Sequence, residues 1–308
     1  MEINQAVATS LTPSAKKKKS GTAWKAYVLL SPALLVILFV FLYPIVQLVI
    51  YSFSSIHGPT STFVGLRNYE FLFENPSFKV AILNNLKLLL AVPILIFLSL
   101  LISILLYEKV KGWKFYRSVL FFPYILAIPV VGIVFSYIFQ LNGILNETLR
   151  AIGLDSLALD WLGSSKHALG TLMGVIIWKE LGFGIVLFLA RLMSISTEQY
   201  EAARLDGAGW WSMHWHITLP ELRNIIEFYF VISVITMISW VFGYVYVMTN
   251  GGPGNSTMVS ELFIYQTAFR NNNIGMASAV SVILLLFSFI FVMIQLSLRK
   301  GDENANFK

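Results

Sequence analysis

The side chains of this chain that could do chemistry are few, and their types and spacing exclude most covalent reactions. There is no cysteine, which removes thiolate catalysis and cysteine-based metal sites. His167, His214 and His216 form no zinc-binding pattern with carboxylates, and no serine stands with a histidine and an aspartate in a nucleophilic arrangement. The G-x-x-x-x-G-K-S/T motif that cradles a nucleotide phosphate is missing from the sequence. We therefore expect neither catalysis nor ATP hydrolysis on this chain.

Two adjacent ionisable residues, Lys179 and Glu180, lie in the middle of a long apolar run. An ionisable group in hydrocarbon costs about 3 kcal/mol or more, so it usually faces a cavity or a protein partner. The two charges can equally offset each other or bond to a second subunit, and both interpretations stay open. Lys87 lies about two turns from the outer end of its apolar run, where a long side chain reaches the headgroups.

The elements that position these residues are membrane-spanning helices. Hydrophobic residues make up 57% of the 308-residue chain and charged residues 12%, with a mean hydropathy of +0.73, whereas about a quarter of the residues in a soluble domain are charged. Six apolar segments reach the ~20 residues that a helix needs to cross a bilayer: about 26–53, 80–107, 118–140, 168–193, 225–248 and 275–298. The backbone must satisfy its own hydrogen bonds in lipid. The predicted fold class is therefore an all-α integral membrane protein with six transmembrane helices.

The basic residues set the orientation of these spans. With the N-terminus inside, fifteen of the 22 lysines and arginines fall on the cytoplasmic side, five fall outside, and Lys87 and Lys179 lie within spans. This bias places both termini and the loop 196–220 in the cytoplasm. It also explains the net charge of +6 without a nucleic-acid partner. We expect a basic disordered cytoplasmic tail at 1–23, one membrane domain at 24–300 and a short cytoplasmic tail at 301–308.

The polar loop 196–220 is about 30 residues long including its flanks, which is too long for a tight turn, so we expect it to contact a soluble partner. Ser196 can cap a helix that begins at Thr197, by accepting from the Gln199 amide while the Gln199 side chain reaches back. Gly207, after Asp206, can take the positive φ that ends this helix. A second amphipathic stretch, 210–217, leads to Pro220 at the start of the next span. The alternative is a pair of helices lying on the headgroups through their tryptophans.

This loop matches the signature E-A-A-x-x-x-G-x9-I-x-L-P and so resembles the permease subunits of bacterial ATP-binding-cassette importers. The fixed positions are Glu201, Ala202, Ala203, Gly207, Ile217, Leu219 and Pro220. The resemblance implies that the loop helix docks into a cleft on a cytoplasmic ATPase subunit, with Glu201 making a key polar contact and Asp206 belonging to the same coupling segment. Ser196 departs from the family, which commonly has proline there. A capping serine replaces a fixed φ, so we expect little effect.

Other segments resemble the carbohydrate branch of this family, in particular the larger permease of maltose-type, glycerol-phosphate-type and multiple-sugar importers. The segments are Phe63 to Tyr69, Asn142 to Asn146 and Thr249 to Pro253, and the similarity covers nearly all of residues 24–298. Each segment alone is weak, because a Gly-Gly-Pro loop is often only a turn. In combination they predict uptake of a sugar or sugar derivative, with an oligosaccharide favoured.

The same resemblance places a substrate pocket on the fourth and fifth spans. The register predicts Ile176, Lys179, Glu180, Phe183, Ser233, Thr236, Met237 and Trp240 as its residues. Aromatic rings stack on the C–H face of a sugar while polar groups bind its hydroxyls. Charges here replace neutral groups of the maltose pattern, which argues against maltose itself.

The resemblance further implies an assembly in the bacterial cytoplasmic membrane. The partners would be a second related permease, two ATPase subunits that carry ATP and Mg, an extracytoplasmic solute-binding protein and membrane lipid, with no cofactor on this chain. ATPase closure would move the loop helix and rock the spans between outward and inward access. The alternatives are a permease for a non-sugar solute, a membrane scaffold without a cavity, and a secondary transporter, which predicts inverted repeats and midplane carboxylates.

Overall fold

The computed structural model describes residues 21–57 and 60–306, so most of the predicted tail at 1–23 lies outside the described residues. The chain divides into two compact units, Met1–Leu48 and Val49–Lys308. In the first unit, α1 (Gly21–Val36) leads through a π-helical turn, η1 (Ile37–Leu42), into α2 (Tyr43–Ser52), which extends past the unit boundary. The large apolar side chains from Tyr27 to Val46 are exposed, as expected of a helix whose natural surroundings are lipid.

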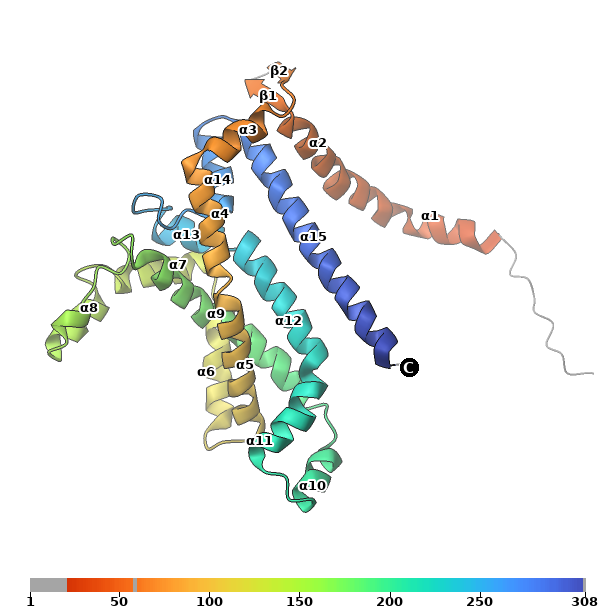
Figure 1. Ribbon diagram of the computed structural model, residues 1–308, viewed down its shortest axis with the longest axis vertical. Helices are drawn as coiled ribbons and strands as arrows, with labels where there is room; N and C mark the ends of the chain where they lie inside the picture. Colours follow the sequence, from red (N-terminus) through yellow and green to blue (C-terminus); the bar gives the residue numbers. More distant parts are fainter. Residues whose placement is uncertain (1–20, 58–59, 307–308) are drawn as a thin grey trace, which may run out of the picture. The chain divides into compact units, whose positions relative to one another are not determined.

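The second unit contains the remaining helices and one small sheet (Figure 1). In chain order its elements are β1 (Ser54–His57), β2 (Thr60–Phe63), α3 (Arg67–Glu74), α4 (Pro76–Leu88), α5 (Ala91–Tyr107), α6 (Trp113–Ile125), α7 (Ile128–Ile138), α8 (Ile144–Ala151), η2 (Asp155–Leu157), α9 (Ala168–Leu192), α10 (Thr197–Leu205), α11 (Trp210–Met213), η3 (His214–Thr218), α12 (Leu219–Ser239), α13 (Phe242–Met248), α14 (Ser260–Tyr265), η4 (Gln266–Arg270) and α15 (Ile274–Asn306).

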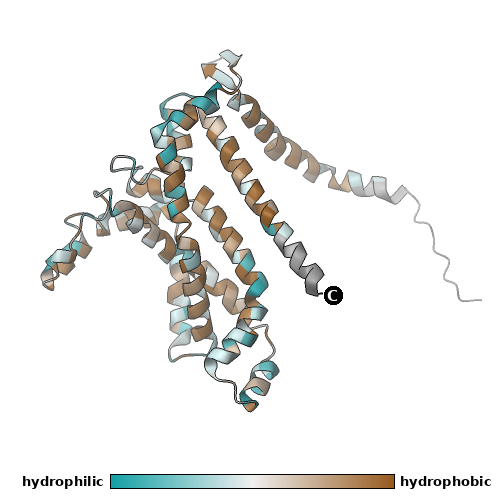
Figure 2. Ribbon diagram, in the orientation of Figure 1, coloured by the Kyte–Doolittle hydropathy of each residue, from teal (hydrophilic) through white to brown (hydrophobic). Residues whose placement is uncertain are grey.

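The membrane spans confirm the predicted pattern of apolar segments, with two differences. Five helical stretches in the described chain are long and apolar enough to cross a bilayer, and the bent pair α6 and α7 makes up to six. These helices are predominantly apolar in Figure 2. The third predicted span, 118–140, bends by 101° between α6 and α7. Leu126 and Ala127 are extended there, and Pro129 lies in the first turn of α7, where its missing N–H is not needed.

The fifth predicted span, 225–248, is wrong at its C-terminal end. Helix α12 stops at Ser239, Trp240 takes a non-helical φ of −136°, and α13 is a separate short helix. Asn85 of α4 bonds to the chain at this break. Its amide donates to the carbonyls of Met237 at 3.1 Å and Ile238 at 3.3 Å. Its Oδ1 accepts from the Ser260 amide at 2.8 Å. One buried side chain thus ties α12 to α14.

A short β-hairpin departs from the all-helical expectation. Strands β1 and β2 pair antiparallel, with Ser54 opposite Phe63 and His57 opposite Thr60. The side chain of Asn68 in α3 donates to the carbonyls of Ser52 and Ser54, each at 2.9 Å. The strand propensity of threonine favours this hairpin, but four-residue strands give a weak pattern beside the long apolar runs.

Close packing in the second unit centres on α9. Gly182 and Gly184 let neighbouring helices approach, since a Cβ at Gly182 would lie 2.8 Å from the Leu120 carbonyl oxygen of α6. Ser103 of α5, fully buried, donates to the Ile185 carbonyl at 3.1 Å. Small residues that bring backbones together are typical of helix contacts in membranes. The helix that carries Lys179 and Glu180 is therefore held on two sides.

Candidate functional site

The loop 196–220 folds as the sequence predicts, with one change in its cap. Helix α10 begins at Thr197, and the Ser196 hydroxyl accepts from the Glu198 amide at 3.3 Å. The expectation that it accepts from Gln199 is wrong. Ser196 is extended, with φ −62° and ψ 128°, and from that position the side chain reaches the second helical amide, which is an equally common cap.

The end of α10 confirms the predicted break at Asp206 and Gly207. Gly207 has φ +78°, and its amide donates to the Arg204 carbonyl at 3.1 Å. This left-handed conformation favours glycine, which has no Cβ to clash. Leu205, directly before the break, is 89% exposed. The helix therefore presents a large apolar side chain on an otherwise polar surface.

The second half of the loop returns to the bilayer as one continuous helical stretch. Helix α11 passes through the π-helical turn η3 into α12, whose first turn contains Pro220, as predicted. Ala203 and Ile217 pack against a small buried cluster of Ile104, Leu192, Ile195, Tyr200, Met213 and Leu222. Leu219 is half-buried, whereas Glu201, Ala202, Asp206, Gly207 and Pro220 are exposed. The signature thus combines positions that hold the loop in place with positions left free for contact.

A chain of polar contacts, which the sequence did not predict, joins this loop to the end of α5; it is buried at Tyr200, Thr218 and His214 and exposed at Glu108. The Tyr200 hydroxyl lies 3.0 Å from Thr218 Oγ1, and that oxygen lies 2.8 Å from His214 Nδ1. His214 Nε2 is 3.3 Å from Glu108 Oε1, which also accepts from the Trp210 indole at 2.6 Å. Burial raises the pKa of the Tyr200 hydroxyl, so it stays neutral. The network connects the loop to residue 108, just past the end of α5.

A second group of polar side chains surrounds a cavity between α9 and α12. Glu180 and Phe183 from α9 line it together with Ser233, Thr236 and Met237 from α12. All five were predicted as pocket residues, and their spacing places them on facing sides of the two helices. The cavity volume is about 10 Å³, which is room for about one water molecule. A sugar ring does not fit into the cavity of this chain alone.

The other predicted pocket residues lie elsewhere. Ile176 is fully buried in the core, and Trp240 is 67% exposed beyond the end of α12. Lys179 is 5% exposed, and its Nζ donates to the Tyr124 carbonyl of α6 at 3.2 Å. The same Nζ lies 3.7 Å from Glu180 Oε1. Adjacent residues are about 100° apart around a helix, so Lys179 and Glu180 face different neighbours.

The carboxylate of Glu180 is held in place by residues that the sequence analysis missed. The Tyr244 hydroxyl donates to Glu180 Oε1 at 2.9 Å, and the Tyr229 hydroxyl donates to the Glu180 carbonyl at 3.4 Å. These tyrosines come from α13 and α12, and no spacing in the sequence links them to position 180. Among the described residues no group of three or more His, Cys, Asp and Glu side chains is arranged to hold a metal.

Known proteins are similar to this chain along nearly its whole length. A family model described as "Binding-protein-dependent transport system inner membrane component" matches residues 59–301. The chain is 35% identical to the probable ABC transporter permease protein YurN of Bacillus subtilis (strain 168), over 90% of this chain and 96% of that one. It is 33% identical to the multiple sugar-binding transport system permease protein MsmF of Streptococcus mutans serotype c, over 93% and 99%.

A solved structure has the same fold. It is a bacterial ABC transporter involved in the import of the acidic polysaccharide alginate, with a TM-score of 0.77 and 25% sequence identity. The match covers 91% of this chain and 96% of that one.

Proposed function

Because this chain belongs to the family of binding-protein-dependent transport system inner membrane components, we propose that it carries a sugar or sugar derivative, with an oligosaccharide favoured. The chain is the transport subunit of an ABC importer and not an enzyme. The observation that carries the sugar assignment is its identity of 33%, along almost its full length, with a permease named for multiple sugars. The hydroxyls and aromatic ring around the Glu180 cavity support the same solute class.

We infer that a second, related permease completes the solute path. The cavity beside Glu180 is about 10 Å³, far below the roughly 300 Å³ of an ordinary ligand pocket. The missing wall would come from a homologous subunit, and rocking of the two subunits would open the path alternately to each side. An extracytoplasmic binding protein would deliver the solute, as the family description implies.

ATP and Mg would be bound by two partner ATPase subunits, which dock on α10. Support comes from the loop itself: Glu201 is exposed, Leu205 is 89% exposed, and the buried contact between Tyr200 and Thr218 behind them holds the helix. A surface of this kind suits a protein cleft, where the leucine is buried and the carboxylate meets a cation. This requires the loop and both termini to be cytoplasmic, in a bacterial cytoplasmic membrane, which agrees with the basic-residue bias.

The test is purification of the complete importer in lipid nanodiscs, followed by mass spectrometry of the solute released from the co-purified binding protein. We expect a sugar, and ATP-dependent uptake of that sugar into proteoliposomes. Release of an amino acid, peptide or other non-sugar solute would refute the sugar assignment. Uptake that follows an ion gradient and ignores ATP would instead identify a secondary transporter.

A further inference from the structure

A second cavity, which we call the outer pocket, lies between α7 and the outer end of α9. Its volume is about 560 Å³, within the range of roughly 300–1,000 Å³ that small-molecule sites occupy. It is separate from the Glu180 cavity, since the two share no lining residue. The outer pocket is therefore large enough for a ligand that the midplane cavity of this chain cannot hold.

Four aromatic side chains form its walls. Phe135 and Phe139 of α7 stack with ring centroids 5.6 Å apart and an interplanar angle of 21°. The ring of Trp178 in α9 contacts Phe135 edge-on, with ring centroids 5.0 Å apart. The ring centroids of Trp161 and Phe139 are 6.0 Å apart. Trp178 is 40% exposed. Rings arranged in this way offer apolar surface to the C–H face of a sugar ring.

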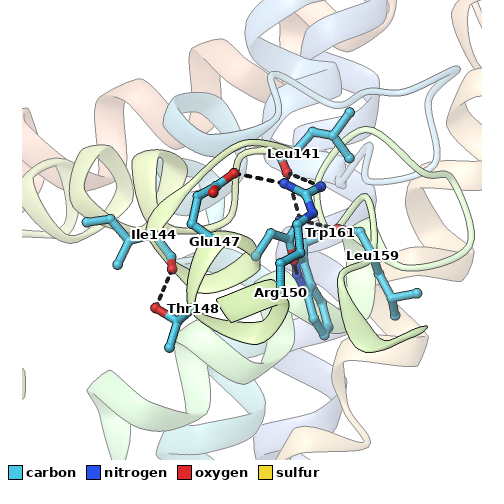
Figure 3. Close-up of polar contacts among 8 residues, drawn as sticks. Leu141, Ile144, Glu147, Thr148, Arg150, Leu159 and Trp161 are labelled. Carbon is cyan, nitrogen blue, oxygen red and sulfur yellow. Dashed lines mark hydrogen bonds and ion pairs between the residues drawn. The ribbon is translucent and has the colours of Figure 1, made fainter. Parts of the chain in front are cut away.

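The Trp161 wall is fixed by a polar network that Figure 3 displays. The Trp161 indole donates to Asn146 Oδ1 at 2.8 Å, and the fully buried Asn146 amide donates to the carbonyls of Leu141 and Leu159 at 3.0 and 2.8 Å. Arg150 pairs with Glu147 at 2.8 Å beside them. Because the Trp161 indole N–H already donates to Asn146, it is not available to a ligand. Trp161 therefore contributes only the apolar surface of its ring to the pocket.

The floor is the bare surface of α9. Nothing lies within 4 Å of where a Cβ would stand at Gly170 or at Gly174. Gly170, Gly174 and Trp178 follow one another at four-residue spacing, so they lie along one face of the helix, over about 12 Å. This is the length of about two pyranose rings. The two glycines keep open a trough that ends at the Trp178 ring.

Two polar residues line the pocket just before the start of α9. His167 Nδ1 is buried and has no hydrogen-bond partner within the described part of the chain. Lys166 also lines the pocket and forms no ion pair with the residues that the structure describes. An unpartnered buried polar atom is costly, and a ligand hydroxyl or carboxylate would supply the missing partner.

We propose that the outer pocket binds one or two pyranose rings of the transported sugar, with an acidic or hydroxyl substituent directed at Lys166 and His167. This rests on the proposed function and adds to it a binding subsite on the outer side of the path. A rival occupant is a helix of the second permease, because two glycines four residues apart also suit helix contacts. The unpartnered polar groups of Lys166 and His167 and the aromatic rings that line the pocket favour the sugar.

The absence of cysteine from the chain permits a direct test. Gly174→Cys places one thiol in the trough, where its Cβ meets no neighbour, and Thr148→Cys places one on exposed α8 as a control. The complete importer in nanodiscs is labelled with a charged methanethiosulfonate reagent, with and without sugar. The probe is the sugar recovered from the binding protein, with maltotriose and trigalacturonate as neutral and acidic references.

At a sugar concentration of about ten times Kd, labelling at position 174 should slow about tenfold, because about a tenth of the sites remain empty. Labelling at position 148 should stay the same. Equal labelling at 174 in an importer that transports the same sugar would overturn the proposal. A thiol at 174 that stays unreactive with and without sugar would also overturn it, in favour of a partner helix. Failure of the unsubstituted importer to transport any sugar would refute the proposed function itself.

A kinetic measurement gives an independent readout. Gly174→Met fills the trough, so KM for sugar uptake should rise about tenfold, with a smaller change in kcat, because ground-state binding is lost. Thr148→Met should leave both unchanged. An unchanged KM for the position 174 variant would exclude the outer pocket from the sugar path.

Discussion

The loop 196–220 and the Glu180 cavity are built in opposite ways. The loop carries exposed residues on α10 and is held from behind by a chain of polar contacts from buried Tyr200 to exposed Glu108. The cavity turns its polar groups inward, fastens Glu180 to Tyr244, and has a volume of about 10 Å³. The loop packs against its own chain, whereas the cavity is too small for a sugar ring. On the proposed function, coupling is therefore a property of this subunit, while solute selection is shared with a second one.

The largest effect is expected when the charge of Glu201 is reversed, which tests whether the loop and the cavity have different roles. Glu201→Lys should lower ATP-driven uptake on the order of 100-fold and abolish co-purification of the ATPase, because it opposes a charge at the proposed contact. The measurement is uptake into proteoliposomes with an ATPase pull-down. Glu198→Lys, on the same helix and also exposed, is the matched control and should have little effect. Full uptake and co-purification by Glu201→Lys would show that α10 is not the docking helix.

The cavity is tested by Glu180→Gln, which removes the charge but keeps the shape. We expect KM for uptake to rise about tenfold, since a hydrogen bond to a charged group is worth about 1.5–3 kcal/mol, while the ATPase still co-purifies. Tyr244→Phe should act in the same direction and more weakly, because it removes only the donor to Glu180. Loss of assembly in place of a change in kinetics would give Glu180 a structural role.

Lys179→Leu distinguishes the role of Lys179 from that of the adjacent Glu180. Lys179 is buried against the Tyr124 carbonyl, and its removal leaves Glu180 without the cation at 3.7 Å. Transport kinetics should therefore change while assembly is kept. Unchanged kinetics would remove Lys179 from the solute site.

The rigid connection behind the loop is tested at His214. His214→Phe keeps a ring but breaks the contacts to Thr218 and Glu108, so fewer sugars should be imported per ATP hydrolysed, by a factor of about five, from loss of ~1 kcal/mol of coupling. His214→Gln retains polar atoms and should restore part of the ratio. The measurement is the ratio of sugar imported to ATP consumed. An equal ratio in all three proteins would make the network a packing feature only.

The smallest effect is expected at Lys87, which is exposed on α4. If its side chain reaches the headgroups, Lys87→Leu should change the uptake rate by less than about twofold. A larger loss in reconstituted uptake would place Lys87 in the solute path or against the second permease.

The sequence predicted the loop well because its determinants are local. A serine cap, a glycine at positive φ and a proline in the next helix's first turn all act within a few residues. The spans follow from apolar run length for the same reason. Glu108 and His214 are 106 residues apart, and no periodicity connects them.

The structure brings five of the eight predicted pocket residues together, and the other three lie apart for physical reasons. The i, i+3 and i+4 spacing places Ser233, Thr236 and Met237 together as long as α12 continues. Trp240 falls outside because the helix ends at Ser239. Asn85, which bonds to the carbonyls at that break, is more than 150 residues from Met237 and Ile238 along the chain. The sequence of the fifth span therefore gives no sign of this contact.

The Asn85 side chain also bears on leakage. At a helix break inside a membrane, freed carbonyls are commonly hydrated, and a file of water molecules is a route for protons and small ions. Here the carbonyls of Met237 and Ile238 accept from one buried amide, so these two groups have a protein partner and need none from water. An importer that concentrates its solute loses work through a hydrated gap, and this asparagine removes two sites at which water would bind.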